Sequence, residues 1–258
     1  MPPPHRRDAI LLSNEIVGPA LHVLTFEWPD ADPVDFVPGQ YVTFYLQRQG
    51  KQITRSYSFF SSPTVRDRFS LLVKKLPLGF GSTLLCELSP RAKTALTTLA
   101  PLGKFVVQDP GSRAVVLVAT GTGLAPFVPM LERLKGEHPQ SDTWLFFGVR
   151  FVAELVDFAE LRSLERAWTS FHFVPVVSRP PGDGSWSGAT GHVQEQVRTQ
   201  FPDLSQADVY LCGVNEMVNE MREIALETGC PKERVFVERY GEDAEPEVPP
   251  ASPIAPSS

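Results

Sequence analysis

The sequence predicts a fold of two domains, an N-terminal antiparallel β-barrel followed by a C-terminal α/β domain built on a parallel sheet. Three observations support this prediction. The chain has 258 residues, more than the roughly 100–150 of a usual single domain. Residues 10–107 contain short apolar runs separated by turn residues. From about residue 113, β-branched runs alternate with segments of helical periodicity.

The first half is predicted to be all-β. Clusters of Pro, Gly and Asp, such as PDADPVDFVPG and SSPTVRD, separate its apolar and aromatic runs. Runs of this length with closely spaced turns are typical of an antiparallel barrel or sandwich. One or two helical turns are expected near residues 81–88. The expected strands are LHVLTFEW, QYVTFYL, RSYSFF, RFSLLVKKL and GKFVV.

The second half alternates strands with helices. AVVLVAT precedes FVPMLERLKGEH, TWLFFGVR precedes VAELVDFAELRSLERAW, FHFVPVVS follows, and DVYLCG precedes NEMVNEMREIALETG. Such alternation predicts a parallel sheet wrapped by helices. The boundary is expected within residues 108–113, which gives domains at 1–110 and 111–241. Residues 242–258 are acidic and rich in Pro and Ser, so a disordered tail is predicted.

Composition excludes several classes of protein. The formal net charge of −6 argues against a nucleic-acid binder, which needs clustered Lys and Arg. No apolar run approaches the roughly 20 residues of a membrane helix, and the run at 9–12 is too short for a secretory signal, so a cytoplasmic protein is expected. The three scattered cysteines, Cys86, Cys212 and Cys230, predict no disulfide framework, zinc site or four-cysteine iron–sulfur cluster.

A candidate phosphate-binding loop joins a strand to a helix in VLVATGTGLAPFVPML. Gly121, Thr122 and Gly123 allow the backbone to approach a diphosphate, and the free N–H groups at a helix start favour anions. A glycine pair also marks any tight strand-to-helix turn, so the pair alone leaves both interpretations open. Pro126 stands where the dinucleotide fingerprint GxGxxG has its third glycine, which disfavours an ordinary Rossmann dehydrogenase.

Pro126 also makes GTGLAPF similar to the GxGxxP segment of the ferredoxin-NADP reductase superfamily. Other segments resemble that family in the same order, over roughly residues 10–241. They are Pro38-Gly39-Gln40-Tyr41-Val42, Arg55-Ser56-Tyr57-Ser58, Gly79-Phe80-Gly81-Ser82, PLGKF at 101–105, and Leu211-Cys212-Gly213-Val214-Asn215-Glu216-Met217-Val218. The resemblance implies a barrel that binds FAD and an α/β domain that binds a nicotinamide nucleotide.

The resemblance implies that Arg55, Tyr57 and Ser58 bind the flavin. Arg55 would pair with the diphosphate, for which an Arg fork is well suited because it donates two parallel hydrogen bonds. Tyr57 would pack on the ring system, and the Ser58 hydroxyl would reach the ring edge. Taken without the resemblance, Tyr57 fits one face of a half-buried strand and Arg55 its solvated face.

Gly81, Ser82 and Thr83 are implied to supply backbone N–H and hydroxyl donors to the same diphosphate, at the start of a short helix. The alternative role is an ordinary helix N-cap, which Ser and Thr commonly provide. The two roles are compatible.

Three residues near the chain's end are implied to surround the reacting groups. Cys212 would pack near the transferred hydride without forming a covalent bond, although a lone cysteine on an apolar strand is more often an inert core residue. Glu238 and Tyr240 look like the terminal E-x-Y of plant-type and some bacterial family members. There the Tyr covers the flavin and the Glu helps the site handle protons. This sequence departs from that pattern because it continues past Tyr240.

NADPH is favoured over NADH by cationic and hydroxyl residues that follow strand ends. Arg150, Ser178 and Arg179 resemble positions that bind the ribose 2′-phosphate in NADP-using bacterial relatives. The alternative for both arginines is ordinary solvation at the surface. His192 stands where the family has a further arginine, and a neutral imidazole would hold phosphate less strongly.

Together these features predict an FAD-containing oxidoreductase that exchanges hydride with NADP(H). The chain has too few cysteines for a cluster, so the one-electron partner is expected to be a separate protein, a ferredoxin or a flavodoxin. One alternative is the reductase component of an oxygenase or other electron-transfer system. Another, of a different class, is a flavin-binding module without catalytic turnover.

Overall fold

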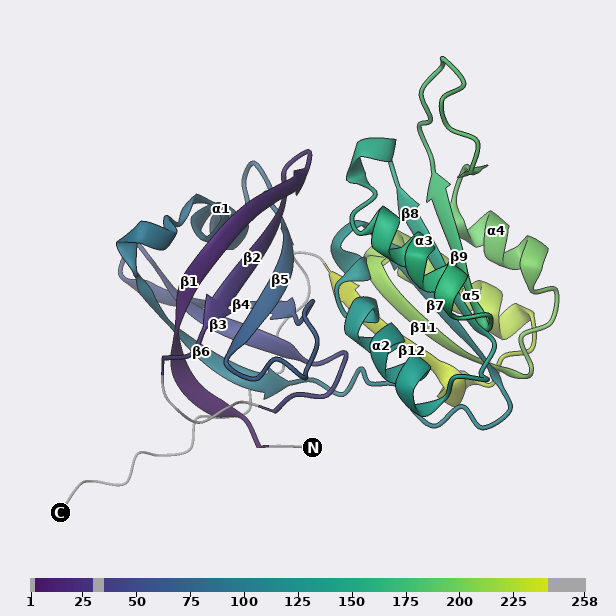
Figure 1. Ribbon diagram of the computed structural model, residues 1–258, viewed down its shortest axis with the longest axis horizontal. Helices are drawn as coiled ribbons and strands as arrows, with labels where there is room; N and C mark the ends of the chain where they lie inside the picture. Colours follow the sequence, from purple (N-terminus) through teal and green to yellow (C-terminus); the bar gives the residue numbers. More distant parts are fainter. Residues whose placement is uncertain (1–2, 30–34, 241–258) are drawn as a thin grey trace.

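The computed structural model describes residues 3–29 and 35–240, which form two lobes (Figure 1). The expected tail, 242–258, lies outside the described residues. The N-terminal lobe is built from strands and the C-terminal lobe from a sheet with helices on both faces, so the predicted fold class is confirmed.

The N-terminal lobe is a six-stranded antiparallel barrel. Its strands follow the order β4-β3-β6-β1-β2-β5, and a bridge between Phe59 and Leu71 joins the two edges of the sheet. Phe26 fills the interior against Phe44 and Phe69, with ring centroids 5.2 and 5.5 Å away. The strands are β1 (His5–Gly18), β2 (Leu21–Glu27), β3 (Tyr41–Arg48), β4 (Lys51–Ser58), β5 (Arg68–Lys74) and β6 (Ala95–Leu102).

The C-terminal lobe has a parallel sheet in the order β10-β9-β8-β7-β11-β12. The chain builds outwards from β7 in one direction and then returns to add β11 on its other side. The edge between β7 and β11 is therefore the topological switch point, where open α/β sheets bind ligands beyond the strands' carboxyl ends. The strands are β7 (Ala114–Thr120), β8 (Thr143–Val149), β9 (Phe171–Val177), β10 (Ala189–Thr190), β11 (Ala207–Val214) and β12 (Val235–Tyr240).

Helices cover both faces of this sheet (Figure 1). Alternate residues of β7 explain why: Val115 and Leu117 belong to one buried core, and Val116 and Val118 to the other. A strand buried on both faces gives the continuous apolar run seen in the sequence. The first core includes α2 (Phe127–Glu137) and α3 (Phe158–Ala167), and the second includes α4 (Val193–Gln200) and α5 (Asn215–Glu227).

The prediction of a strand at GKFVV is wrong. The last barrel strand is β6, and residues 103–110 form the connection to the second lobe. Its apolar side chains are used elsewhere. Phe105 packs on Phe127 and Tyr210 of the C-terminal lobe, with ring centroids 5.9 and 6.0 Å away. A run of alternating apolar residues predicts a buried face but does not identify what that face packs against. Here it packs against the core of the C-terminal lobe.

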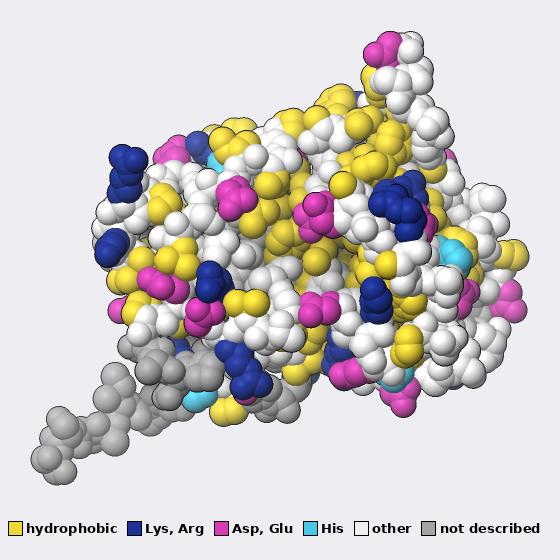
Figure 2. Space-filling model, viewed as in Figure 1, with side chains coloured by type: hydrophobic (Ala, Val, Ile, Leu, Met, Phe, Trp, Pro, Cys, Tyr) yellow, Lys and Arg dark blue, Asp and Glu magenta, His cyan; other side chains and the backbone are white. Residues whose placement is uncertain are grey.

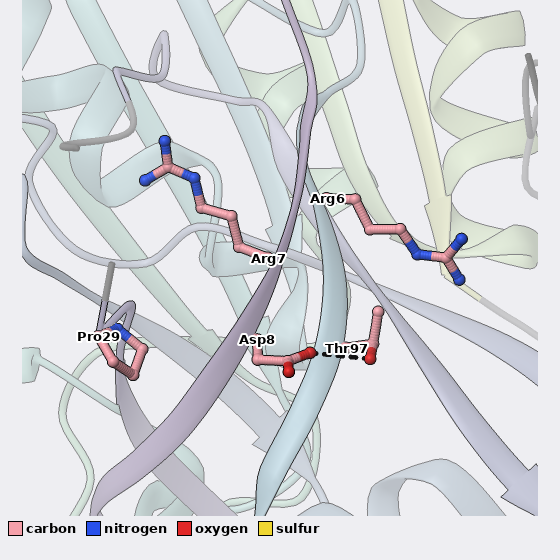
Figure 3. Close-up of a pocket in the computed structure, with 5 residues that line it drawn as sticks. All are labelled: Arg6, Arg7, Asp8, Pro29 and Thr97. Carbon is pink, nitrogen blue, oxygen red and sulfur yellow. Dashed lines mark hydrogen bonds between the residues drawn. The ribbon is translucent and has the colours of Figure 1, made fainter. Parts of the chain in front are cut away.

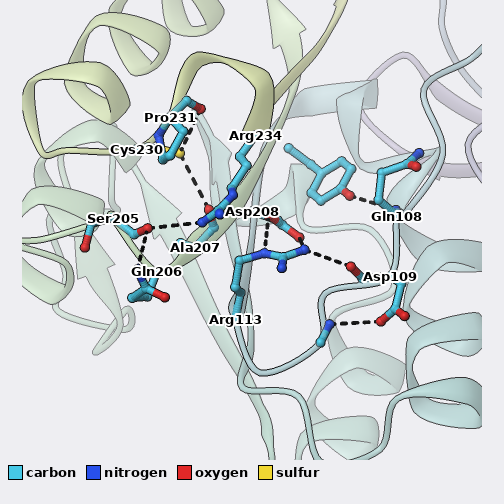
Figure 4. Close-up of polar contacts among 12 residues, drawn as sticks. Gln108, Asp109, Arg113, Ser205, Gln206, Ala207, Asp208, Cys230, Pro231 and Arg234 are labelled. Atoms are coloured by element: carbon cyan, nitrogen blue, oxygen red, sulfur yellow. Dashed lines mark hydrogen bonds and ion pairs between the residues drawn. The ribbon is translucent and has the colours of Figure 1, made fainter.

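Polar contacts anchor the chain where it enters the second lobe (Figure 4). The Arg113 guanidinium donates from Nε and Nη2 to both oxygens of Asp208, at 2.8 and 2.9 Å. Nη2 also donates to the backbone oxygen of Asp109 at 2.8 Å. The Gln108 N–H donates to the Tyr210 hydroxyl at 2.9 Å. The connection is thus fixed at several points to β11.

Candidate functional site

Four side chains from three strands and both lobes meet at one place. Ser58 ends β4, Cys212 lies in β11, and Glu238 and Tyr240 lie in β12, where Glu238 is the register partner of Cys212. The Tyr240 hydroxyl donates to Ser58 Oγ at 2.5 Å, and Ser58 Oγ donates to Glu238 Oε1 at 3.3 Å. Tyr240 also contacts Cys212. The four residues predicted to be catalytic are therefore neighbours, although 180 residues separate Ser58 from Glu238.

Burial controls the protonation of this group. It raises the pKa of Glu238 to about 8, and the hydrogen bond from Ser58 only partly opposes that rise. Glu238 Oε2 is buried and has no hydrogen-bond partner among the described residues. Burial also raises the pKa of the Cys212 thiol well above its usual range. A thiol held in the neutral form is a poor nucleophile, which favours the predicted packing role of Cys212.

The second cluster joins β4 to α1 (Phe80–Glu87), the helix that follows β5. A Cβ placed on Gly81 would lie 2.6 Å from Arg55 Cγ and 3.2 Å from the Tyr57 hydroxyl. The helix start thus packs directly on these two side chains, and only glycine leaves room. The Arg55 guanidinium is exposed and donates to the Thr54 carbonyl at 2.7 Å.

The hydroxyls of Ser82 and Thr83 hold the turn that precedes α1. Ser82 Oγ accepts the Leu76 N–H and donates to the Gly79 carbonyl, both at 3.1 Å. Thr83 Oγ1 donates to the Leu76 carbonyl at 3.1 Å. These hydroxyls therefore fix the loop, and the donors that remain for an anion are the N–H groups of the first helical turn, which have no intrahelical acceptor.

These two clusters fit a flavin dinucleotide. Arg55 and the start of α1 together offer positive potential to a diphosphate. The orphaned Glu238 Oε2 and the Ser58 hydroxyl offer polar groups for the edge of a ring system. Tyr240 supplies an aromatic face beside Ser58.

The glycine loop lies at the sheet's switch point. It forms a short 3₁₀ segment, η2 (Gly121–Leu124), between β7 and α2, and Pro126 precedes α2. Gly121 has φ +55°, in the left-handed region that favours glycine. A Cβ on Gly123 would lie 2.2 Å from the Cys212 carbonyl oxygen, so the loop's backbone touches β11. The Thr122 side chain is partly exposed in this loop.

The residues predicted to bind the 2′-phosphate lie together at the ends of β8 and β9. The Ser178 N–H donates to the Val149 carbonyl at 3.0 Å, and the Arg179 N–H donates to the Arg150 carbonyl at 2.8 Å. Both arginines are exposed, and neither forms an ion pair within residues 3–29 and 35–240. His192 is exposed and lies directly before α4.

Sequence reasoning missed three contributors to this region. Glu154, nearly buried, bonds to Lys74 of the barrel at 2.7 Å. The Thr120 hydroxyl accepts the Val214 N–H at 3.3 Å and so ties β7 to β11. The buried Oδ1 of Asn215, at the start of α5, has no partner among the described residues. Thr120 and Asn215 lie within motif segments described above, VLVATGTGLAPFVPML and residues 211–218, but the motifs assign neither side chain a role, and Glu154 lies in no such motif.

A separate hollow lies on the outside of the barrel, lined by Arg6, Arg7, Asp8, Pro29 and Thr97. Arg6 and Arg7 point in opposite directions from β1, and Asp8 accepts a hydrogen bond from Thr97 at 2.8 Å (Figure 3). This hollow contains none of the predicted site residues.

Among the described residues no helix has the length and apolar character that crossing a membrane would require.

Two family models match the chain: an oxidoreductase FAD-binding domain over residues 8–107 and an oxidoreductase NAD-binding domain over residues 117–223. Ferredoxin--NADP reductase B of Sorangium cellulosum is 36% identical over 241 residues, which are 90% of this chain and 97% of that protein. The reductase component of propane 2-monooxygenase from Rhodococcus jostii is 29% identical over 80% of this chain and 56% of its own length.

Solved structures share the fold. The Amycolatopsis cytochrome P450 reductase GcoB superposes with a TM-score of 0.83 at 25% identity, covering 92% of this chain and 70% of its own. A ferredoxin-NADP+ reductase from Plasmodium falciparum has the same fold, with a TM-score of 0.71 at 16% identity over 91% of this chain and 96% of its own. The extent of the match to the Sorangium protein and the two adjoining domain models show that the chain belongs to the ferredoxin-NADP reductase superfamily and is a flavin-dependent oxidoreductase.

Proposed function

We propose that this protein exchanges hydride between NADP(H) and a bound FAD and passes single electrons to a separate protein carrier. In this proposal residues 1–110 hold the flavin and residues 111–241 hold the nicotinamide nucleotide. The observation that carries it is the meeting of Ser58, Cys212, Glu238 and Tyr240 beside the glycine loop, because both lobes contribute to that one place.

When bound, a flavin accepts a hydride from a nicotinamide and releases electrons one at a time. The protein's residues position the reactants and handle the proton. Ser58 donates to Glu238 Oε1, which leaves Oε2 to carry the proton that the raised pKa retains at neutral pH. Tyr240 covers the place beside Ser58 and must move aside for a nicotinamide ring. Cys212 and Gly123, in backbone contact, limit how close that ring approaches.

The flavin is tested by colour and by titration. The purified protein is expected to be yellow, to release FAD on denaturation, and to bleach when NADPH is added without oxygen. Tyr57→Ala is expected to weaken FAD retention by about 10-fold or more, because base and ring stacking on an aromatic side chain is worth roughly 1–3 kcal/mol. Protein that stays colourless after incubation with FAD contradicts the proposal.

The nucleotide preference is tested by removing one positive charge. Arg179→Ala is expected to lower kcat/KM for NADPH by about 10-fold or more, since a hydrogen bond to a charged group is worth roughly 1.5–3 kcal/mol. The kcat/KM for NADH is expected to stay within about 2-fold, because NADH has no 2′-phosphate. Arg198→Ala is the matched control, as Arg198 is an exposed arginine of α4 that pairs with Glu227. A wild-type protein that prefers NADH contradicts this part of the proposal.

The carrier is identified by anaerobic electron transfer. With NADPH as donor, reduction of a ferredoxin and of a flavodoxin is followed separately by absorbance. The sequence has only three cysteines, all of them buried, whereas an iron–sulfur cluster is usually held by four, so in this proposal any cluster belongs to the partner. The alternative partner is an oxygenase system, as the name of the Rhodococcus relative describes for that protein. Transfer to an oxygenase component and to neither small carrier supports that alternative.

A further inference from the structure

An ion pair joins the two lobes beside the nucleotide-binding edge. Lys74 Nζ, at the end of β5 in the barrel, lies 2.7 Å from Glu154 Oε1 in the C-terminal lobe. The Glu154 side chain is only 9% exposed, so water screens this pair less than an ordinary surface pair. Glu154 lies in the short 3₁₀ segment η3 (Val152–Glu154), four residues after Arg150.

The second carboxylate oxygen of Glu154 holds the backbone that carries the predicted phosphate-binding residues. Glu154 Oε2 accepts the N–H of Arg150 at 3.1 Å and the N–H of Phe151 at 3.2 Å. The Arg150 carbonyl in turn accepts the Arg179 N–H at 2.8 Å. One carboxylate thus fixes, directly or through one further hydrogen bond, the main chain at both arginines.

On the barrel side the same ion pair leads to the turn before α1. Lys74 is two residues before Leu76, whose N–H and carbonyl are held by the hydroxyls of Ser82 and Thr83. The lobes also touch through backbone next to the pair, since a Cβ on Gly18 would lie 2.8 Å from the Ala153 carbonyl oxygen. Hydrophobic side chains gather along this junction on the face shown in Figure 2.

We propose that Glu154 is a positioning residue for 2′-phosphate recognition, and that its bond to Lys74 makes nucleotide affinity depend on the flavin-binding lobe. The proposal rests on the NADPH preference proposed above. With the Lys74 contact in place, the carboxylate is held at one position. The two N–H groups that donate hydrogen bonds to it are then held in place as well. Without that contact the carboxylate is free to change rotamer, and the arginines lose their fixed spacing.

The deciding variant is Lys74→Met, which changes the other lobe and leaves every residue of the nucleotide-binding edge intact. It is expected to raise the Kd for NADP+, measured by calorimetry on the flavin-loaded protein, by about 3–10-fold, which lies within the range of couplings transmitted through packed networks. Lys75→Met is the matched control. Lys75 is the next residue, carries the same charge and pairs at 2.8 Å with Glu87 inside the barrel lobe, so its loss is expected to leave the Kd unchanged.

Glu154→Gln provides a second, local test. It keeps an acceptor for the two N–H groups but loses the charge that holds Lys74, so it is expected to raise the Kd for NADP+ at least as much as Lys74→Met. The Kd for NAD+ is expected to stay within about 2-fold, and the KM for NADPH is expected to rise while kcat changes little, because a group that only positions the 2′-phosphate site alters binding alone. A general loss of structure would affect both nucleotides.

Two results overturn the positioning role: equal Kd values in Lys74→Met, Lys75→Met and wild-type protein, or a Glu154→Gln variant that binds NADP+ as wild type does. Either result leaves the proposed function intact as long as the wild-type protein prefers NADP+. A wild-type protein without that preference contradicts the proposed nucleotide choice instead, and the same titration series separates the two cases.

Discussion

Replacing Arg113 with methionine is expected to lower the free energy of unfolding by about 3–5 kcal/mol, the usual cost of removing one partner from a buried ion pair. The Asp208 carboxylate is 2% exposed, and both of its oxygens accept from this one guanidinium. Without Arg113 the carboxylate remains buried and loses these two donors. The measurement is equilibrium urea unfolding of the flavin-loaded protein at pH 7.

The reverse change is expected to cost less. In Asp208→Asn the Arg113 side chain remains 26% exposed and still donates to the Asp109 carbonyl, so a loss of about 1–2 kcal/mol is expected from the weaker hydrogen bonds alone. The double variant is expected to recover part of the loss seen in Arg113→Met. Arg133→Met removes an exposed helical pair with Glu137 and is expected to change the free energy of unfolding by less than about 0.5 kcal/mol. Equal losses in all three single variants would contradict the assignment of a buried anchor.

The second large effect is a dependence of stability on pH through Glu238. Its pKa is raised by burial to about 8, whereas an unfolded glutamate ionises near 4.3. Between these values the unfolded chain releases the proton and the folded protein keeps it. The free energy of unfolding therefore falls as the pH rises from about 4.5 to 8. The fall amounts to roughly 3–5 kcal/mol, because each pH unit between the two pKa values corresponds to about 1.36 kcal/mol. Below pH 4.5 the contribution is constant.

Glu238→Gln is expected to remove this slope, because the amide is neutral at every pH. Urea unfolding of flavin-free protein at pH 5, 6, 7 and 8 gives the comparison. As the pH rises, the free energy of unfolding of the variant is expected to increase relative to that of the wild type. Glu216→Gln, at an exposed carboxylate in the first turn of α5, is the control and is expected to keep the wild-type slope. Parallel curves for wild type and Glu238→Gln would show that the carboxyl is ionised in the folded protein.

The local patterns of the sequence were sufficient for the fold class and for the order of most elements. Alternation in β2 and the continuous run of β7 each follow from which faces of a sheet are buried. The helix α4 and the strand β12 were not expected, because VQEQVRTQ has only two buried positions and VFVERY was interpreted only as a motif. The switch point between β7 and β11 follows from strand order, which local patterns do not specify.

The residues of the candidate site were named from motif resemblance, whereas the contacts among them were not predicted. Motif resemblance named Ser58, Glu238 and Tyr240, but the hydrogen bonds among them depend on how two lobes dock. The same holds for Ser82. Its hydroxyl was expected to bind the diphosphate, but it is hydrogen-bonded to the backbone of the turn before α1. Glu154 had no sequence signal, since its importance comes from a lysine 80 residues away.

The connection between the lobes has a consequence for any attempt to express them separately. Phe105 and Val107 belong by sequence to the barrel side of the expected boundary, yet their side chains complete the core of the other lobe. A fragment that begins at residue 111 would carry an open cavity where these two side chains belong and would expose Phe127 and Tyr210. A fragment that begins before Gly103 retains them. A C-terminal fragment of this protein must therefore begin before residue 103, earlier than the change from strands to alternating strands and helices suggests, because the linker packs in its core.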